Sequence, residues 1–411
     1  IFTLAAALHY LGPAHRFPTD LLADELDKTG KVVKNLFLRG TGDPALTADA
    51  LASMAAQVRA AGIGQVSGDI VIDDTAFDAV PWGKGWMWDD LQDAFSAPVS
   101  GVNLAGNALT VEVMPGARPG APVRVATAPV TGFVTVANSA TTAAPGAPSS
   151  LRIAVKDPPA DNTGLLPAQV IQVSGALPQD ALPRGKRFAV RDAATWAGTL
   201  LREALKAARV EVGGTLRRAA VPPTAVMLAS SLSPELGATA NDYMKWSNNH
   251  GMECLLKRVG AVTTLSAGSW ANGTLAVRNF LQTIVGLDVS TINVEDGSGA
   301  SRYSMVTPAQ LTRLLGALHD SFNTGPEFVA ALPIGGVDGT LGHRMLAPSL
   351  HARVRAKTGS MTGVSNLAGF LETEDGERLA FAILMDAYPG PVESLRRLQD
   401  DILLLLSQPA G

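Results

Sequence analysis

The sequence is poor in the residues that build disulfides, metal sites and nucleic-acid-binding surfaces. Its only cysteine, Cys254, excludes an internal disulfide, and its 6 histidines lie apart, without the paired spacing of a metal site. The net charge is −4 at pH 7, so there is no basic excess to bind nucleic acid. No apolar run has the length of a membrane-spanning helix. These absences argue against a metalloenzyme, a nucleic-acid partner and a membrane-embedded chain.

Apolar residues, by contrast, are plentiful. Hydrophobic residues make up 46% of the 411 residues and charged residues 17%, which is typical of a globular protein. A chain of this length can form two or three domains, each with its own hydrophobic core.

Strand and helix patterns alternate near the N-terminus and then give way to strands alone. Residues 36–73 read as a strand, a Gly-Asp-Pro turn, an amphipathic helix over residues 46–61 and a β-branched strand, which together make one α/β unit. From about residue 100 to 160, short alternating runs such as ALTVEVMPG and PVRVATAPV dominate. This stretch predicts a small all-β module, bordered by the proline-rich segments SAPVSG and VKDPPADNTGLLP.

Helix patterns return in the second half of the chain. They predict a helix over residues 193–208, and mostly helices from residue 242 to about residue 332. The chain then reads as alternating strands joined by a hairpin turn at Asp375-Gly376, followed by a final helix over residues 393–406.

The first eleven residues predict a helix that lacks its start. They read as helix interior and end at Gly12-Pro13, yet no Ser, Thr, Asp or Asn precedes Ile1 to cap the helix. One interpretation is the tail of a secretory signal, but no basic segment precedes the run and no small-residue cleavage site follows it. The interpretation that we favour is a truncated or processed chain whose first helix begins before Ile1.

The triplet Lys-Thr-Gly occurs twice, in different contexts. Residues 28–30 lie in the polar run DELDKTGKVV, which predicts a solvated turn before a strand. Residues 357–359 lie inside an alternating strand with a hairpin partner, where a glycine weakens the strand and needs a reason. Close approach of a ligand to the strand backbone would be such a reason, so the second copy is the functional candidate.

The pattern Ser-x-Asn also occurs twice. The copy at residues 321–323 follows a helix pattern and precedes TGPEF, so it predicts a helix-terminating loop. The copy Ser247-Asn248-Asn249 lies at a break between helical segments, where polar side chains can project into a cleft. We expect the first copy along the chain to be the functional one.

Six blocks of sequence carry a family resemblance. In chain order they are LRGTGDPAL, PWGKGWMWDDLQDAFSAPVSGVNL, MKWSNNHGMECLLKRVG, VEDGSGASRYSMVTPAQL, LPIGGVDGTLGHRM and VRAKTGSMTGVSNLAGF. Their order resembles that of class C low-molecular-mass penicillin-binding proteins, the D-alanyl-D-alanine carboxypeptidase/endopeptidase family, over nearly the whole chain. The resemblance implies an α/β (α+β) fold with a penicillin-recognising serine-transpeptidase-like domain, whose antiparallel sheet is flanked by helices.

The resemblance and the composition breaks together predict three parts. Residues 1–22 and 219–411 are expected to form the discontinuous penicillin-recognising catalytic domain. Residues 23–99 and 161–218 are expected to form an inserted α/β domain, with residues 100–160 nested in it as the β-rich module.

The resemblance also explains why the helix over residues 1–11 lacks its start. In this family the active-site helix reads Ser-x-x-Lys, two aliphatic residues, Thr and an Ala-rich run ending in Leu, and IFTLAAAL matches the part after the Lys. It therefore implies a Lys immediately before Ile1 and the nucleophilic Ser three residues earlier. A spacing of three puts both side chains on one helix face, so the Lys amine can take the Ser proton. The 411 residues contain neither group.

Catalytic roles follow from the same resemblance. It implies that Ser247 relays a proton to the leaving amine with help from Lys357, while Asn249 holds the substrate amide. The charge of Lys357 would attract a terminal carboxylate, and the Thr358 hydroxyl would hydrogen-bond to it. Gly359 would let the substrate backbone pair with the strand.

Further substrate-binding residues come from other blocks. The resemblance implies that Ser360 contacts the substrate, and that Asp90, Phe95 and Arg302 line a pocket for the diamino-acid side chain of the stem peptide. The Asp90 carboxylate would face an amine and Arg302 a carboxylate. Thr362 stands where some relatives have an amide side chain.

Three residues near these motifs are expected to be structural. Asp296, in EDGSG, predicts a turn. Glu253 is interpreted as an ordinary helical residue and Cys254 as a buried small hydrophobe.

The resemblance thus implies a serine-type D-alanyl-D-alanine carboxypeptidase or D,D-endopeptidase that acts on peptidoglycan stem peptides, is acylated by β-lactams and uses no cofactor. It implies export to the periplasm or cell envelope. Two alternatives stay open: a non-catalytic peptidoglycan-binding homologue, and a β-lactamase or esterase of the same superfamily. The sequence leaves the preference between carboxypeptidase and endopeptidase, the stem-peptide diamino acid and the oligomeric state undecided.

Overall fold

The chain forms two compact units, which we describe separately. The computed structural model describes residues 1–156 and 169–409. Unit 1 consists of Ile1–Phe17, Gly83–Trp86 and Pro234–Gly411, and unit 2 of Pro18–Trp82 and Met87–Ser233. Unit 1 thus joins both ends of the chain, while the limits of the three expected parts stay a prediction.

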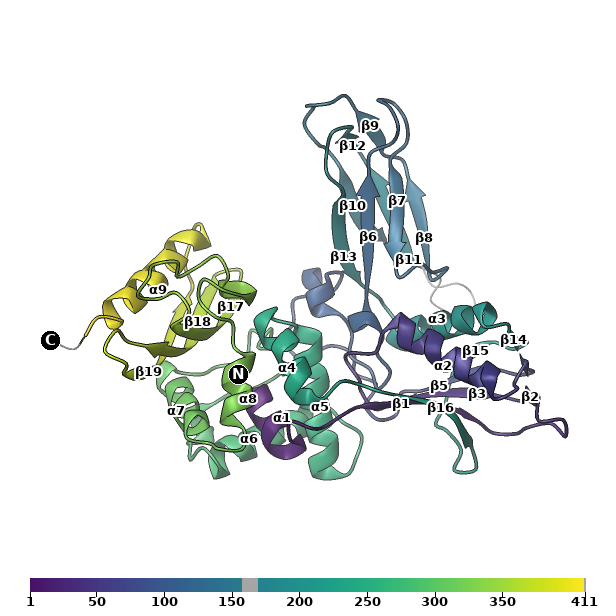
Figure 1. Ribbon diagram of the computed structural model, residues 1–411, viewed down its shortest axis with the longest axis horizontal. Helices are drawn as coiled ribbons and strands as arrows, with labels where there is room; N and C mark the ends of the chain where they lie inside the picture. The colour runs from purple at the N-terminus through teal and green to yellow at the C-terminus, as the bar shows by residue number, and fades with distance from the viewer. Residues whose placement is uncertain (157–168, 410–411) are drawn as a thin grey trace. The chain divides into compact units, whose positions relative to one another are not determined.

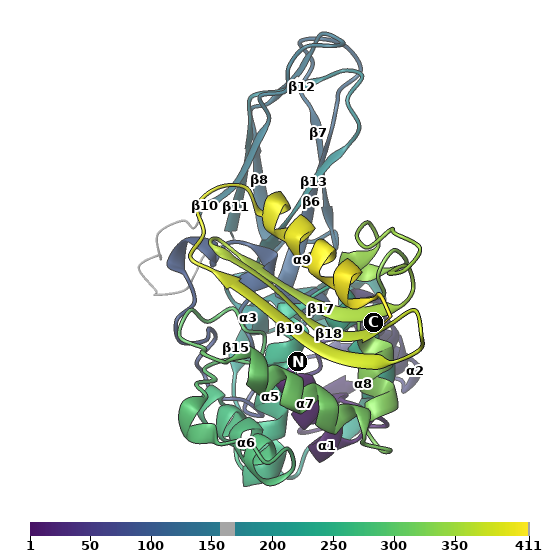
Figure 2. The same ribbon diagram turned by 90° about the vertical axis from the view of Figure 1, so that its left-hand side faces the viewer.

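An antiparallel sheet of three strands organises one half of unit 1. Its order is β17 (Val354–Met361), β18 (Val364–Glu372) and β19 (Arg378–Asp386). Helix α9 (Val392–Leu406) covers one face, and α7 (Pro308–His319) covers the other (Figure 2). The predicted hairpin turn is confirmed, because Gly376 links β18 to β19 with a φ of 89°.

The other half of unit 1 is helical around a buried first helix. Helix α1 (Phe2–Leu11) is buried from Phe2 to Leu8, as expected of a helix interior, and ends at Gly12 with a φ of 78°. It packs against four helices, namely α4 (Leu236–Lys245), α5 (Asn249–Thr264), α6 (Trp270–Thr283) and α8 (Gly325–Ala331). The short helix η4 (Val289–Thr291) packs against α6, whereas η5 (Gly339–Leu341) packs against β17 in the sheet half.

Unit 2 is built on a mixed sheet of five strands. Its order is β15 (Leu216–Arg218), β5 (Ile70–Asp73), β3 (Leu36–Gly40), β1 (Pro18–Ala23) and β16 (Val226–Leu232). β3, β5 and β15 run parallel, whereas β1 is antiparallel to both of its neighbours. Helices α2 (Ala48–Ala60) and α3 (Ala193–Ala207) pack against each other on this unit (Figure 1). The expected strand, turn, helix and strand are therefore confirmed as β3, α2 and β5.

Short strands make up the rest of unit 2. β2 (Val32–Val33), β4 (Gln65–Val66) and β14 (Glu211–Val212) form a small parallel sheet. Two three-stranded sheets and a strand pair make the β-rich module (Figure 1): β6 (Ala108–Met114) with β7 (Arg124–Ala128) and β13 (Arg184–Ala189), β8 (Val134–Asn138) with β10 (Arg152–Lys156) and β11 (Gln169–Ser174), and β9 (Thr141–Ala143) with β12 (Ala176–Pro178).

The β-rich module contains strands beyond residue 160. β11, β12 and β13 follow that point in the sequence, yet they pair with β8, β9 and β6. The proline-rich segment VKDPPADNTGLLP, expected as a border, lies outside the described residues from residue 157 onward.

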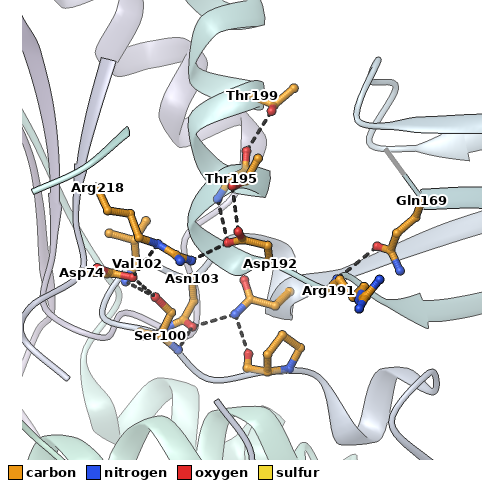
Figure 3. Close-up of polar contacts among 12 residues, drawn as sticks. Asp74, Ser100, Val102, Asn103, Gln169, Arg191, Asp192, Thr195, Thr199 and Arg218 are labelled. Atoms are coloured by element: carbon orange, nitrogen blue, oxygen red, sulfur yellow. Dashed lines mark hydrogen bonds and ion pairs between the residues drawn. The ribbon is translucent and has the colours of Figure 1, made fainter. Parts of the chain in front are cut away.

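A polar network anchors the loop that leads into this module. Arg218 forms ion pairs with Asp74 at 3.4 Å and with Asp192 at 2.5 Å, and the Ser100 hydroxyl donates to Asp74 at 3.3 Å (Figure 3). Asp192 also caps α3, because it accepts from Thr195 N at 3.0 Å. The short helices η1 (Trp88–Asp90), η2 (Ala94–Ser96) and η3 (Ala105–Asn107) lie before and after the anchored loop.

No helix within residues 1–156 and 169–409 is both long enough and apolar enough to cross a membrane.

The anchored loop depends on a close backbone approach at Gly101. A Cβ atom at this position would lie 2.3 Å from the Asp74 carbonyl oxygen, so the backbone would have to shift. We expect Gly101→Ala to lower the free energy of unfolding of unit 2 by about 2 kcal/mol or more. Gly185→Ala is the matched control, because Gly185 is an exposed strand residue whose Cβ would meet only the Val111 carbonyl oxygen, at 3.9 Å. Urea unfolding of both variants measures the difference, and equal midpoints would contradict the prediction.

Candidate active site

A hydrogen bond between Lys357 and Ser247 is at the centre of the candidate active site. Lys357 Nζ donates to Ser247 Oγ at 2.8 Å and to the Thr358 carbonyl oxygen at 2.6 Å. The two side chains are 110 residues apart in sequence. The second Lys-Thr-Gly copy and the first Ser-x-Asn copy, both chosen from context, therefore lie together.

The turn between α4 and α5 presents the Ser247 side chain. Ser247 has a φ of 55°, in the left-handed region that a serine rarely adopts, and it separates the end of α4 from Asn248. Asn248 caps α5, because its side chain accepts from Gly251 N at 3.0 Å. Asn249 is the first residue of α5. Backbone strain of this kind is concentrated at functional sites in proteins.

The start of α1 lies beside the same lysine. Burial lowers the pKa of the Lys357 ammonium to about 8. The backbone nitrogen of Ile1, which precedes α1, lies close enough to Lys357 to interact with its charge. A charge effect of this kind requires proximity. Helix α1 packs against α4 and α5, on either side of the turn that bears Ser247, so this part of the expectation is confirmed, while its packing against β17 stays a prediction.

Strand β17 offers part of its outer edge to a ligand. Ala356 N donates to the Pro333 carbonyl oxygen, so residue 333 covers the first half of this edge. Backbone groups alternate along a strand, so those of Thr358 and Ser360 point to the same edge. Past Ala356, no backbone group in the described part of the chain pairs with this edge, although the Thr358 carbonyl oxygen accepts from the Lys357 side chain. An added Cβ at Gly359 would meet only Asn366, at an ordinary 3.6 Å, so the protein's own packing does not require this glycine.

The expected substrate-binding residues fall in both units. Arg302 belongs to unit 1, where its Nη1 donates to the Thr362 carbonyl oxygen at 2.8 Å, next to the turn between β17 and β18. Asp90 and Phe95 belong to unit 2, on η1 and η2. The expected approach of these two residues to Arg302 stays a prediction.

The other copies of the two motifs have the structures expected of them. Lys28-Thr29-Gly30 forms an exposed turn, in which Thr29 Oγ1 donates to Asp27 at 2.6 Å. Residues 321–323 lie in the loop between α7 and α8, with Phe322 93% exposed. Both predictions are confirmed.

Glu253 is not the ordinary helical residue that we expected. Its side chain is fully buried on α5, one turn after Asn249. Oε2 accepts from Gly297 N at 2.7 Å and from Trp270 Nε1 at 3.0 Å, while Oε1 accepts from Ser298 N at 2.8 Å. Burial, and then the Asp296 carboxylate, raise the pKa of Glu253 to about 8. No local sequence pattern indicates this role, because Gly297 lies 44 residues away.

The loop held by Glu253 also contacts α1. The Thr3 hydroxyl, in the first turn of α1, donates to the Gly297 carbonyl oxygen at 2.5 Å. Asp296 forms the predicted turn, because it accepts from Gly299 N at 2.9 Å and from Ser301 N at 2.6 Å. Cys254 is buried, as expected of a small hydrophobe. The Glu253 side chain thus links α5 to α1 through one loop.

Two further features near the motifs were not predicted. The Thr340 hydroxyl lies 2.8 Å from the Thr358 hydroxyl, and Lys245 forms an ion pair with Asp338 at 2.6 Å. The block LPIGGVDGTLGHRM contains Thr340 and Asp338, but no spacing in it indicated which residues face β17. No group of three or more His, Cys, Asp or Glu residues in the described ranges could hold a metal ion.

Comparison with known structures assigns the fold to the penicillin-recognising serine hydrolases. The crystal structure of penicillin binding protein 4 from Haemophilus influenzae matches with a TM-score of 0.85 and 29% sequence identity, over 99% of this chain and 90% of that one. A structure of the same Haemophilus protein in complex with a β-lactam matches with a TM-score of 0.79 and 27% identity, over 99% and 89% of the two chains.

Sequence comparison gives the family. The model of the D-Ala-D-Ala carboxypeptidase 3 (S13) family matches residues 1–406. A D-alanyl-D-alanine carboxypeptidase of Actinomadura sp. (strain R39) is 36% identical over 100% of this chain and 76% of its own length. The D-alanyl-D-alanine carboxypeptidase DacB of Haemophilus influenzae is 32% identical over 96% and 81%. This chain belongs to the S13 family of serine-type D-Ala-D-Ala carboxypeptidases, and the predicted family and fold class are confirmed.

The Glu253 contacts give a stability prediction. Glu253→Gln replaces one acceptor oxygen with an NH₂ group, which leaves at least one of the three N–H donors buried without an acceptor. We expect the change to lower the free energy of unfolding of unit 1 by about 1–3 kcal/mol. The control is Glu374→Gln, because Glu374 is exposed. Urea unfolding, followed by tryptophan fluorescence, compares the two variants. A loss at Glu253 no larger than that at Glu374 would rule out a supporting role.

Proposed function

We propose that this protein is a D-alanyl-D-alanine carboxypeptidase and D,D-endopeptidase that cleaves peptidoglycan stem peptides through a serine acyl-enzyme. The observation that supports this most strongly is the 2.8 Å hydrogen bond from Lys357 to Ser247, beside the start of α1. In this proposal the nucleophilic Ser and its Lys precede Ile1 in a Ser-x-x-Lys sequence. Residues joined to the Ile1 nitrogen would continue from a point next to Lys357.

Acylation would begin with proton transfer inside Ser-x-x-Lys. The Lys amine takes the Ser proton, and the Ser oxygen attacks the carbonyl carbon of the penultimate D-alanine. The C–N bond to the terminal D-alanine then breaks. The Ser247 hydroxyl relays the proton from the Ser-x-x-Lys amine to the leaving amine, with Lys357 hydrogen-bonded beside it. Water then attacks the ester carbonyl carbon, and the proton that it loses returns to the Ser oxygen as the acyl bond breaks.

Substrate binding would use the strand edge and the charges around it. A stem peptide pairs with the outer edge of β17 at Thr358 and Ser360, and Asn249 holds its amide. The Lys357 charge and the Thr358 hydroxyl bind the terminal carboxylate. Where a substrate strand lies along β17, a glycine at position 359 lets the two backbones approach closely.

The remaining residues would select the stem peptide. We propose that Asp90 and Phe95 bind the diamino-acid side chain and that Arg302 faces its carboxylate. This substrate is found in the periplasm or cell envelope, so we propose that the protein is exported. β-Lactams would act as inhibitors because they acylate the same serine.

Mass spectrometry tests the position of the nucleophile. We expect benzylpenicillin to add one covalent equivalent to the protein with its native residues before Ile1, on a peptide that carries Ser-x-x-Lys. A polypeptide limited to residues 1–411 should form no adduct, because Lys357, Thr358 and Asn249 bind but do not attack. An adduct on residues 1–411 would place the nucleophile elsewhere. A native protein without Ser-x-x-Lys would support the non-catalytic homologue, and rapid turnover of penicillin would support the β-lactamase.

The duplicated triplet supplies a matched pair of variants. We expect Lys357→Ala to slow acylation by benzylpenicillin at least tenfold, because a charge-assisted contact to the carboxylate contributes about 1.5–3 kcal/mol. Lys28→Ala should leave the rate unchanged, since Lys28 lies in an exposed turn of unit 2. Rate constants from timed mass spectra measure both. Equal rates in the two variants would show that the wrong copy had been chosen.

A further inference from the structure

The Thr340 hydroxyl lies beside the expected carboxylate-binding group. Thr340 is an exposed residue of η5, and its Oγ1 is 2.8 Å from Oγ1 of Thr358 on β17. A hydroxyl has one donor hydrogen and two acceptor lone pairs, so in this pair one hydroxyl donates to the other. A carboxylate only accepts, and its two oxygens can take a hydrogen bond from each of two adjacent hydroxyls.

The backbone that carries Thr340 is held in place by an ion pair. Asp338 Oδ2 accepts from Lys245 Nζ at 2.6 Å, and Asp338 Oδ1 accepts from Ile334 N at 2.8 Å. Lys245 Nζ also donates to the Leu332 carbonyl oxygen at 3.1 Å. Its side chain is 17% exposed, so solvent screens this ion pair less than a surface pair.

Close backbone packing adds to this support. Gly339 precedes Thr340 with a φ of 55°, and an added Cβ would lie 2.6 Å from the Lys245 carbonyl oxygen. Only glycine fits both the backbone conformation and the space. Lys245 lies two residues before Ser247, so the same ion pair joins the end of α4 to the Thr340 loop.

We infer that Thr340 is a further substrate-binding residue, whose hydroxyl binds the terminal carboxylate of the substrate together with Thr358. Lys245 and Asp338 are positioning residues that hold this hydroxyl at β17. The inference rests on the proposed function, because it assumes that a substrate carboxylate lies at Lys357 and Thr358. It adds a second hydroxyl from a different loop to the groups that β17 itself provides.

The test compares a carboxylate with its ester. Benzylpenicillin and benzylpenicillin methyl ester are used to acylate the native protein and its variants, and rate constants are read from timed mass spectra. We expect Thr340→Val, which keeps the side-chain shape and removes the hydroxyl, to slow the reaction of the acid by about tenfold. The rate with the ester should change little, because the ester has no charge for the hydroxyl to bind.

Two further variants separate binding from folding. Thr340→Ser restores a hydroxyl and should recover most of the acid rate, which a merely structural loss would not predict. Asp338→Asn keeps an oxygen for Ile334 N but removes the ion pair, and it should lower the ratio of acid to ester rates less than Thr340→Val does. Equal slowing with acid and ester in Thr340→Val, or no slowing with either, would overturn the inference. Wild-type protein that forms no adduct with the acid would instead overturn the proposed function, and the inference with it.

Discussion

The hydrogen bond between Lys357 and Ser247 is the interaction that joins the sheet half and the helical half of unit 1 at the candidate active site. It joins the edge strand of a sheet to a turn between two helices, over a sequence separation of 110 residues. Each side is fixed by its own means. The strand is fixed by its register with β18, and the turn is fixed by the left-handed Ser247 and the Asn248 cap. The strained conformation of Ser247 persists because the surrounding structure determines it.

The third component, α1, is held by a different kind of interaction. It is buried on all sides from Phe2 to Leu8, and Ala5, Ala6 and Ala7 have no exposed surface. The hydrogen bond from Thr3 to Gly297 adds direction, and Glu253 fixes Gly297 in turn. A buried carboxyl with three N–H donors can hold a loop in one place, because any displacement leaves polar groups unpaired.

Features that depend on neighbouring residues in the sequence could be predicted, whereas features that depend on contacts between distant residues could not. The strand that carries Lys357 was recognisable from its alternating apolar residues and its hairpin turn. The neighbouring sequence also distinguished the functional candidates, Lys-Thr-Gly at residues 357–359 and Ser-x-Asn at residues 247–249, from their other copies. Glu253 could not be recognised, because a glutamate in a helix has the same local pattern whether water or a loop 44 residues away surrounds it. Thr340 was missed for the same reason, since only the fold brings η5 to β17.

The two halves of strand β17 have different surroundings. Its first half, Val354 and Ala356, is buried and covered by residues 333–335, so it anchors the strand in the core. Its second half carries Lys357, Thr358 and Ser360, and here the outer edge has no backbone partner in the described part of the chain. An unprotected strand edge invites aggregation, which proteins reduce with charge on the edge. Under the proposed function, the charge of Lys357 beside this edge would favour a peptide that ends in a carboxylate.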